Sequence, residues 1–401
     1  MQFRYGEYEG DPFPTPDSLF PSPKVVRFIL QYGQQALDSM EQSEDEQLAQ
    51  MVQEMLDAGL LERDANTGEL KLTPRMVRGI QHRSLLEIFQ GLRRGSRDGH
   101  GAYDAGRSDE RSDGTRPYEF GDAISELDTH ATMRNALARQ VKDEGWREGQ
   151  GDMPHATLPI QLNVSDFELH ETESRTDVAT CILLDMSGSM MRYGRFFQAK
   201  RVALGMASLI RQQFPLDTVD YVGFYSTACR VRESDLPLLM PKPVSLYDPA
   251  VNLHLPLEQA LKNPRRVPQH FTNLQLGLRM ARQILSRRGA ANKQIFIITD
   301  GQPTAHVASD PIQGEVLHLI YPPRQETAIF TMQEAMRCQQ QSIRLATFAL
   351  IEDYYGMEWV DFVDQLTRLT RGTAFYCSSD DLSSTVIESY LSGKRRKRVV
   401  K

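Results

Sequence analysis

The sequence predicts an α/β protein built on a doubly wound, mostly parallel, Rossmann-like sheet. From residue 177 onward, short apolar runs alternate with helix-patterned segments, as they do in such folds. The clearest runs, 178–184, 294–299 and 343–350, are apolar almost throughout, which is typical of strands buried on both faces. Aspartates directly follow the first two runs, at the strand ends where open α/β sheets bind ligands.

The other expected elements of this part continue the alternation. Two long connections, 236–270 and 305–325, are expected to be loops at the ligand end of the sheet, the first with a short helix near 257–261. Such loops either recognise a partner or merely span gaps. The remaining expected strands are 219–225, 229–232 and 373–377, and the expected helices are 195–213, 273–287, 327–341, 357–369 and 381–391.

Residues 1–90 are expected to form a small helical N-terminal region with a short hairpin. Helices begin near Pro23 and Asp45, a glycine turn lies within 66–73, and Thr73 caps a further helix with Pro74 at its first position. The order helix, hairpin, helix resembles a winged-helix module, which would favour nucleic-acid binding. The acidic character of the region favours the alternative, a helical docking domain.

The middle of the chain separates this region from the C-terminal domain. Residues 91–117 are rich in Gly, Arg, Asp and Ser, with almost nothing to bury, and are expected to be a flexible linker. Residues 118–176 form an expected connecting region with a helix near 129–140, and the C-terminal domain is expected to span 177–398.

Composition narrows the class of protein. A length of 401 residues with 40% hydrophobic and 25% charged residues is typical of a globular protein of two or three domains. The net charge of −7 argues against a nucleic-acid partner. The four cysteines form no C-x-x-C pair, so neither zinc nor a disulfide framework is indicated. Because no run reaches the roughly 20 apolar residues of a membrane span and the start lacks a signal-peptide pattern, we expect a cytoplasmic protein.

Oxygen-bearing side chains gather where the two apolar runs end. Asp185, Ser187 and Ser189 form an Asp-x-Ser-x-Ser motif after the first run, Asp300 follows the second, and Thr272 opens a helix between them. Carboxylate and hydroxyl oxygens are the ligands that small divalent cations prefer. A helix-capping turn, with the serines satisfying backbone donors, is the alternative interpretation.

The expected ion is Mg²⁺. Two carboxylates on neighbouring strands repel each other unless a cation or proton lies between them. Mg²⁺ takes six oxygens, so five protein groups leave a position for water or an incoming ligand. Mn²⁺ or Ca²⁺ could take its place. His270 and His306 lie near the motif in sequence, but imidazole is a poor ligand for so hard a cation, and we leave both out of the ligand set.

These residues resemble the metal-ion-dependent adhesion site (MIDAS) of von Willebrand factor A (VWA) domains, with every position of the pattern present. A wider resemblance, over about residues 118–398, is to bacterial CoxE-like and magnesium-chelatase-D-like VWA proteins. It rests on the segments 331–338, 343–348, 359–364, 371–375 and 389–396. The resemblance implies a protein-binding subunit that uses its metal to grip an acidic side chain, working with a separate AAA+ ATPase of the MoxR or chelatase type.

We therefore expect a non-enzymatic, metal-dependent adaptor. The chain contains no G-x-x-x-x-G-K-[ST] phosphate loop and no G-x-S-x-G nucleophile elbow. A metal-bound water could in principle hydrolyse a phosphoester, which is the residual enzymatic interpretation. Two further hypotheses stay open: a free-standing VWA module that binds some different acidic protein, and a nucleic-acid-binding regulator that acts through the N-terminal region.

Overall fold

The computed structural model describes residues 23–43, 46–64, 67–95, 115–118, 127–143, 160–170, 177–351 and 357–395. The chain divides into two units, residues 1–98 with 177–401, and residues 99–176. No helix in the described residues is both long and apolar enough to cross a membrane.

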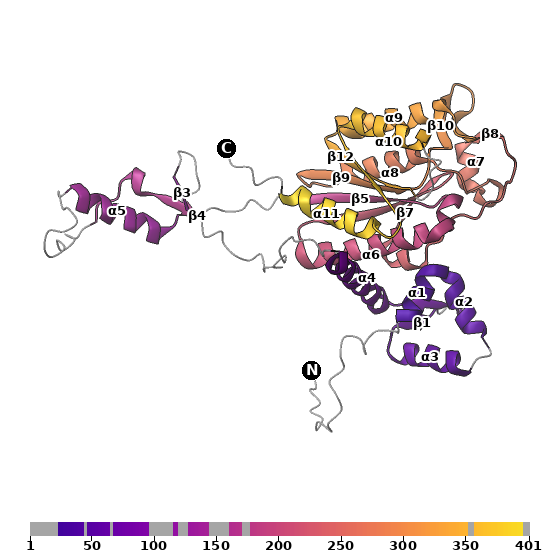
Figure 1. The fold of residues 1–401 in the computed structure, drawn as a ribbon, viewed down its shortest axis with the longest axis horizontal. Helices are drawn as coiled ribbons and strands as arrows, with labels where there is room; N and C mark the ends of the chain where they lie inside the picture. Colours follow the sequence, from indigo (N-terminus) through magenta and orange to yellow (C-terminus); the bar gives the residue numbers. More distant parts are fainter. Residues whose placement is uncertain are drawn as a thin grey trace. The chain divides into compact units, whose positions relative to one another are not determined.

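A six-stranded sheet in the order β13-β12-β9-β5-β6-β7 forms the centre of the larger unit (Figure 1). All neighbouring pairs are parallel except β6 and β7. The chain passes from β5 to β6 on one side and later to β9 on the other, so the strand order reverses between β5 and β9. The strands are β5 (Val178–Asp185), β6 (Thr218–Phe224), β7 (Ala228–Val231), β9 (Asn292–Thr299), β12 (Ile343–Leu350) and β13 (Thr373–Cys377).

Helices cover both faces of this sheet, which confirms the predicted doubly wound α/β fold (Figure 1). Side chains alternate along β5: Ile182 and Leu184 join one core with α6 and α11, whereas Leu183 joins the other with α8, α9 and α10. Because both faces are covered, the strand is apolar at nearly every position. The helices are α6 (Arg195–Gln213), α8 (Leu274–Ser286), α9 (Gln325–Gln340), α10 (Met357–Thr370) and α11 (Leu382–Arg395).

The two long connections, expected to be loops, instead build a second, antiparallel sheet in the order β10-β11-β8. Its strands are β8 (Val251–Pro256), β10 (Ala305–Asp310) and β11 (Gly314–Tyr321). The side chain of Asp310 closes the hairpin by accepting from the backbone N–H groups of Ile312 and Gln313, both at 2.8 Å. The expected short helix is present as α7 (Leu257–Lys262). The short 3₁₀-helical segments η3 (Gly188–Gly194), η4 (Glu233–Leu238) and η5 (Pro264–Arg266) complete this part.

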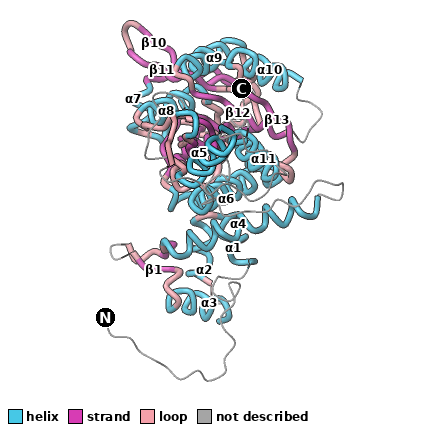
Figure 2. Tube along the Cα trace, turned by 90° about the vertical axis from the view of Figure 1, so that its left-hand side faces the viewer, coloured by secondary structure: helices cyan, strands magenta, loops and turns pink. Residues whose placement is uncertain are grey.

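The N-terminal region is helical, as predicted, and packs against the larger sheet domain through α4 (Figure 2). Gly205 of α6 permits this contact, since a Cβ there would lie 2.7 Å from Cδ1 of Ile88. Helix α4 continues through residues 91–95, which were expected to begin the linker. The elements are α1 (Pro23–Tyr32), α2 (Gln34–Gln42), α3 (Glu46–Asp57), β1 (Leu61–Arg63), β2 (Leu70–Leu72) and α4 (Pro74–Gly95).

The smaller unit contains the expected helix as α5 (Thr129–Asp143). Strands β3 (Thr115–Pro117) and β4 (Glu168–His170) pair antiparallel, so the end of the predicted linker is a strand. Arg139 of α5 forms an ion pair at 2.9 Å with the buried Asp166 of η2 (Val164–Asp166). The rest of the predicted linker, residues 96–114, lies outside the described residues.

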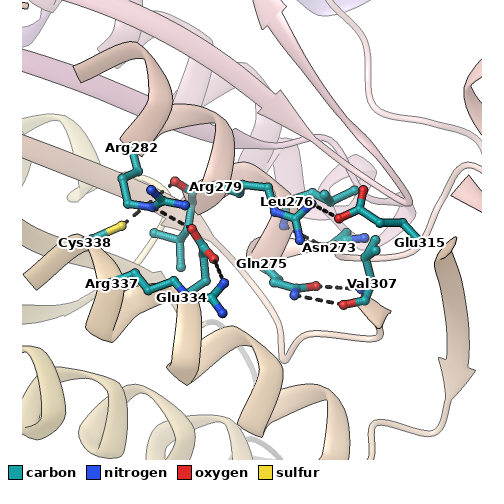
Figure 3. Close-up of polar contacts among 11 residues, drawn as sticks. Asn273, Gln275, Leu276, Arg279, Arg282, Val307, Glu315, Glu334, Arg337 and Cys338 are labelled. Carbon is teal, nitrogen blue, oxygen red and sulfur yellow. Dashed lines mark hydrogen bonds and ion pairs between the residues drawn. The ribbon is translucent and has the colours of Figure 1, made fainter. Parts of the chain in front are cut away.

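The buried side chain of Gln275 ties helix α8 to the second sheet by hydrogen bonds (Figure 3). Its Oε1 accepts from the backbone N of Val307 at 2.6 Å, and its Nε2 donates to the backbone O of Val307 at 3.0 Å. The amide thus pairs with β10 as a neighbouring strand would. Two ion pairs add to the attachment of α8: Arg279 with Glu315 of β11 at 2.6 Å, and Arg282 with the buried Glu334 of α9 at 2.8 Å.

We expect Gln275→Leu to lower the free energy of unfolding by about 2–3 kcal/mol, because it leaves the N–H and C=O of Val307 buried without partners. Urea denaturation of the full chain measures the change. Gln283→Leu is the matched control, since Gln283 is exposed on the same helix, and it should shift stability by no more than about 0.5 kcal/mol. Equal effects of the two substitutions would show that the hydrogen bonds between Gln275 and Val307 do not stabilise the fold.

Lys200 of α6 is fully buried. Its Nζ donates to the backbone O atoms of Pro237 and Leu239, at 3.0 and 2.8 Å, and so fastens the segment after β7 to the helix. Burial lowers the pKa of Lys200 from 10.5 to about 7, because the charged form loses its hydration.

This depressed pKa predicts a pH-dependent stability. Between pH 7 and 10 the unfolded chain binds a proton at Lys200 that the folded chain does not, so stability rises with pH. The unfolding free energy of wild type minus that of Lys200→Met should therefore increase with pH, by at most about 1.4 kcal/mol per pH unit. Lys262→Met, at an exposed lysine, should show no such slope. A wild type minus Lys200→Met difference that stays constant over this range would refute the interpretation.

Candidate metal site at the switch point of the sheet

Four of the five predicted ligands meet where the strand order reverses. Asp185 is the last residue of β5, and Asp300 directly follows β9. Ser187 Oγ lies 3.1 Å from Ser189 Oγ, and Ser189 Oγ donates to Asp300 Oδ1 at 2.7 Å. The backbone N of Ser187 donates to Asp185 Oδ1 at 2.8 Å, which completes a chain of hydrogen bonds from one carboxylate to the other.

The loop after β5 is held in place by its backbone. Met186 N donates to the O of Phe224 on β6, and Gly188 N donates to the O of His270 at 3.0 Å. Gly188 fits closely, since a Cβ there would lie 2.6 Å from Val244 Cγ2 and 3.2 Å from the Cβ of His270. The glycine of Asp-x-Ser-Gly-Ser is therefore required by the close approach of the segment that leads to Thr272.

Thr272, the fifth predicted ligand, is held by its backbone to the segment that follows Asp300. It is buried just before α8, its N donates to Thr304 Oγ1 at 2.8 Å, and its O accepts from the N atoms of Thr304 and Ala305. Asn273 caps α8 by accepting from the N of Leu276 at 3.0 Å. The position of Thr272 thus depends on β10, the strand of the second sheet that begins at Ala305.

The surroundings of Asp185 raise the pKa of its carboxyl. Burial raises the pKa of Asp185 to about 7, and the charge of Asp300 adds to the increase. Hydrogen bonds work in the opposite direction: Thr299 Oγ1 donates to Asp185 Oδ2 at 2.6 Å, and Ser187 donates to the same carboxylate. A negative charge on Asp185 is therefore costly in this environment unless a positive charge lies close by.

Arg195 supplies a positive charge that the sequence analysis did not foresee. Its Nη1 donates to Asp300 Oδ2 at 2.7 Å, and the Asp300 side chain is 0% exposed. The guanidinium also lies 5.1 Å from the centre of the Tyr193 ring. Arg195 is the first residue of α6. Its place directly after the motif loop was the only feature of the sequence that could have indicated its role at the site. Thr299, also missed, is the residue immediately before Asp300.

The residue types fit a small, hard cation. Two carboxylates and neutral hydroxyls at one sheet edge form an all-oxygen donor set. Among the residues that the structure describes, no three His, Cys, Asp or Glu side chains form a metal-holding group, so the acidic part of this site is a pair. Asp185 and Ser187 are buried whereas Ser189 is exposed, so the site opens to solvent on the Ser189 side.

The fold and the sequence comparisons agree on the class: this is a VWA-domain protein. The family model for the vWA domain of Rv0959-like proteins matches residues 178–391, and the model for the third domain of Rv0959-like proteins matches residues 110–172. The chain belongs to the Rv0959-like family. The second match covers most of the stretch in which we expected a linker (91–117) and a connecting region (118–176).

Two curated relatives come from mycobacteria. The chain is 28% identical over 355 residues to Rv0959 of Mycobacterium tuberculosis, and equally to Mb0984 of Mycobacterium bovis. In each case the match covers 87% of this chain and 46% of the relative. The chain thus spans about half the length of the curated relatives it matches.

Similar solved structures include two pilus proteins. The vWF domain of the type V pili tip protein Mfa5 from Porphyromonas gingivalis matches with a TM-score of 0.37 and 12% identity, over 56% of this chain and 98% of that one. The PilB minor pilin from Streptococcus sanguinis matches with a TM-score of 0.37 and 14% identity, over 55% and 63%. Likenesses this low add nothing to the family assignment.

We expect Arg195→Met to destabilise the protein by about 2–4 kcal/mol in EDTA, because the buried Asp300 carboxylate loses its charge partner. Arg192→Met is the matched control, since Arg192 is exposed in the same segment, and it should change stability by about 0.5 kcal/mol or less. Urea denaturation in EDTA measures both. Superimposable curves for Arg195→Met and wild type would show that the ion pair contributes nothing.

Proposed function

We propose that the protein is a divalent-metal-dependent adaptor that grips an acidic side chain of a partner protein. One observation carries the proposal: the chain of hydrogen bonds that joins Asp185, Ser187, Ser189 and Asp300 at the switch point of the sheet. VWA domains are protein-interaction modules, and this edge of the sheet is where open α/β folds bind ligands. Mg²⁺ is the proposed ion, and Mn²⁺ or Ca²⁺ could replace it.

Each residue would have a distinct role when the ion is bound. Bound Mg²⁺ would supply an open coordination position that favours an anionic oxygen. Asp185 and Asp300 would hold the ion by charge, while Ser187, Ser189 and Thr272 would contribute neutral oxygens. Since Ser189 is the exposed member of the chain of hydrogen bonds, the partner's carboxylate would approach from its side.

Arg195 would adjust the strength of this grip. Its ion pair with Asp300 already neutralises one carboxylate, so a bound cation competes with the guanidinium for the same oxygens. The pair keeps the site folded without metal, at the cost of some metal affinity. The chain would therefore bind its ion reversibly.

The partner that we propose is a separate AAA+ ATPase of the MoxR or chelatase type, or a client of that ATPase, in the cytoplasm. The support is the resemblance to CoxE-like and magnesium-chelatase-D-like proteins, together with the absence of any phosphate loop in this chain. We propose no catalytic role for the chain itself. A free-standing VWA module that binds another acidic protein is the rival within the same class.

A second candidate function, nucleic-acid binding through the N-terminal region, has one observation in its favour. A cavity of about 520 Å³ lies between α4 and α6, and its lining includes Arg75, Arg78, His82 and Arg211. Such a lining suits phosphate groups. This function predicts salt-sensitive binding of DNA that survives loss of the metal ligands, because Z neutralised phosphates give a slope of about −0.9Z in log K against log salt.

Affinity capture from native lysate tests the adaptor, with wild type and Asp185→Asn each in Mg²⁺ and in EDTA. We expect an AAA+ ATPase to be recovered by wild type in Mg²⁺ and lost in the other three samples. Asp248→Asn, at an exposed loop aspartate, is the control and should behave as wild type. Calorimetric titration with MgCl₂ should show binding to wild type and at least about tenfold weaker binding to Asp185→Asn.

Two different results would each change the proposal. Metal-dependent recovery of a different acidic protein would replace the ATPase adaptor by the free-standing module. Recovery of the same partners in all four samples would remove the metal grip from the mechanism and direct attention to the cavity between α4 and α6.

A further inference from the structure

The cavity between α4 and α6 has a lining of cationic and neutral polar side chains. Among the residues that the structure describes, no Asp or Glu lines it. Its volume of about 520 Å³ lies within the range of about 300–1,000 Å³ that is typical of small-molecule sites. The lining includes Arg75, Arg78 and His82 of α4 and Ser208, Arg211 and Gln212 of α6. A cavity of this size and charge is a candidate site for a small anion.

The positions of these side chains along the two helices explain why they meet. On α4, Arg75, Arg78 and His82 follow one another at spacings of three and four residues, which places them on one face of the helix. The three lining residues of α6 share a face for the same reason. The helices pack closely, since a Cβ on Gly205 of α6 would lie 2.7 Å from Cδ1 of Ile88 on α4. Helix packing thus collects guanidinium groups around one cavity, where like charges repel one another unless an anion lies among them.

Arg211 is held in place by a network with the buried Gln81. Its Nη1 donates to Gln81 Oε1 at 3.0 Å, and its guanidinium forms an ion pair with Glu233. Gln81 Nε2 donates to Glu233 Oε1 at 2.7 Å, which closes the network. The Glu233 carboxylate offsets one of the three guanidinium charges around the cavity, so three positive charges less one negative charge leave +2.

The two arginines of α4 have more donors to spare. Arg75 Nη1 donates to the backbone O of Ala58 at 2.9 Å, which leaves its other N–H groups for a ligand. Arg78 is exposed and, within the described part of the chain, forms no ion pair or side-chain hydrogen bond. A guanidinium presents its donors in a planar fork that matches the oxygens of a phosphate group. These two side chains therefore suit an oxyanion.

Gln212 leaves two neutral donors in the lining without acceptors. Its Nε2 donates to Nδ1 of His82 at 3.2 Å and to Oγ of Ser208 at 3.1 Å. Because Nδ1 is an acceptor here, the hydrogen of a neutral His82 lies on Nε2. The Ser208 hydroxyl, on a side chain that is buried, likewise keeps its own hydrogen to donate. An anion in the cavity would supply the acceptor that both groups lack.

We propose that this cavity binds a small phosphomonoester, with its phosphate between the arginines of the two helices. The site shares no residue with the switch-point site, so the proposal is independent of the metal-dependent function. A phosphomonoester carries a charge of about −1.5 to −2 at pH 7, which balances the +2 of the arginines and Glu233. Each phosphate of a DNA duplex is a diester with a single negative charge, which balances it less well. The volume of the cavity leaves room for the organic group of the ester.

A ligand held in this way would join the two helices. Helix α4 belongs to the N-terminal region, whereas α6 covers one face of the large sheet. The groups that contact the phosphate lie together only in the folded chain, so binding stabilises the fold and raises its thermal midpoint.

Calorimetric titration of the full chain in EDTA, at constant ionic strength, tests the proposal with two probes, inorganic phosphate and AMP. We expect at least one of them to bind at one site per chain and to raise the thermal midpoint. The affinity should fall by at least about tenfold in Arg78→Gln, which removes a charged donor. Arg83→Gln is the matched control, since Arg83 lies on the same helix outside the cavity lining and pairs with Glu87 at 3.2 Å. Without a probe, both variants should keep the wild-type thermal midpoint.

Three results would overturn the proposal: binding of neither probe by wild type, unchanged affinity in Arg78→Gln, or binding of adenosine, which lacks the phosphate, as tightly as AMP. A random-sequence DNA duplex in the same titration distinguishes the two sources of phosphate. If the duplex binds at least about tenfold more tightly than AMP and Arg78→Gln abolishes this binding, the cavity belongs to the nucleic-acid function instead. Asp185→Asn should bind the probes as wild type does, so failure of the metal-dependent function would leave this result unchanged.

Discussion

The juxtaposition of two aspartates at the reversal of strand order is the constraint on which the rest of this structure depends. Strands β5 and β9 are direct neighbours, so the carboxylates of Asp185 and Asp300 are held close together in a buried place. Neutral hydroxyls of Ser187, Ser189 and Thr299 and the guanidinium of Arg195 surround them. This arrangement stays folded because donors satisfy the oxygens. It suits a cation because burial, and after it the charge of Asp300, raises the pKa of Asp185.

The second sheet supports this site from outside. Thr272 accepts backbone hydrogen bonds from the start of β10, and Gln275 joins α8 to the same strand by pairing with Val307. The segment with Thr272 therefore stands between the large sheet and the small one. The small sheet also carries His318, which lies opposite His306 on β10 and opposite His254 on β8.

The N-terminal helices extend the same unit. Helix α4 packs on α6, the helix that begins with Arg195, and Lys200 of α6 fastens the segment after β7. One helix thus links the candidate site, the N-terminal region and the arginine-lined cavity. The chain belongs to the Rv0959-like family and spans about half the length of the curated relatives it matches.

The sequence alone determined the α/β fold and the VWA class, because buried parallel strands leave continuous apolar runs and the motif residues directly follow them. It also determined that Asp185 and Asp300 would be close, since the ends of parallel strands meet at one edge. Tertiary structure decided the rest. The pairing of β8 with β11 joins segments about 60 residues apart, and pairing over such separations leaves no local signal beyond alternation. The ion pair of Arg195 with Asp300 and the row of His254, His318 and His306 likewise depend on register and packing, which fix distances that no spacing in the sequence encodes.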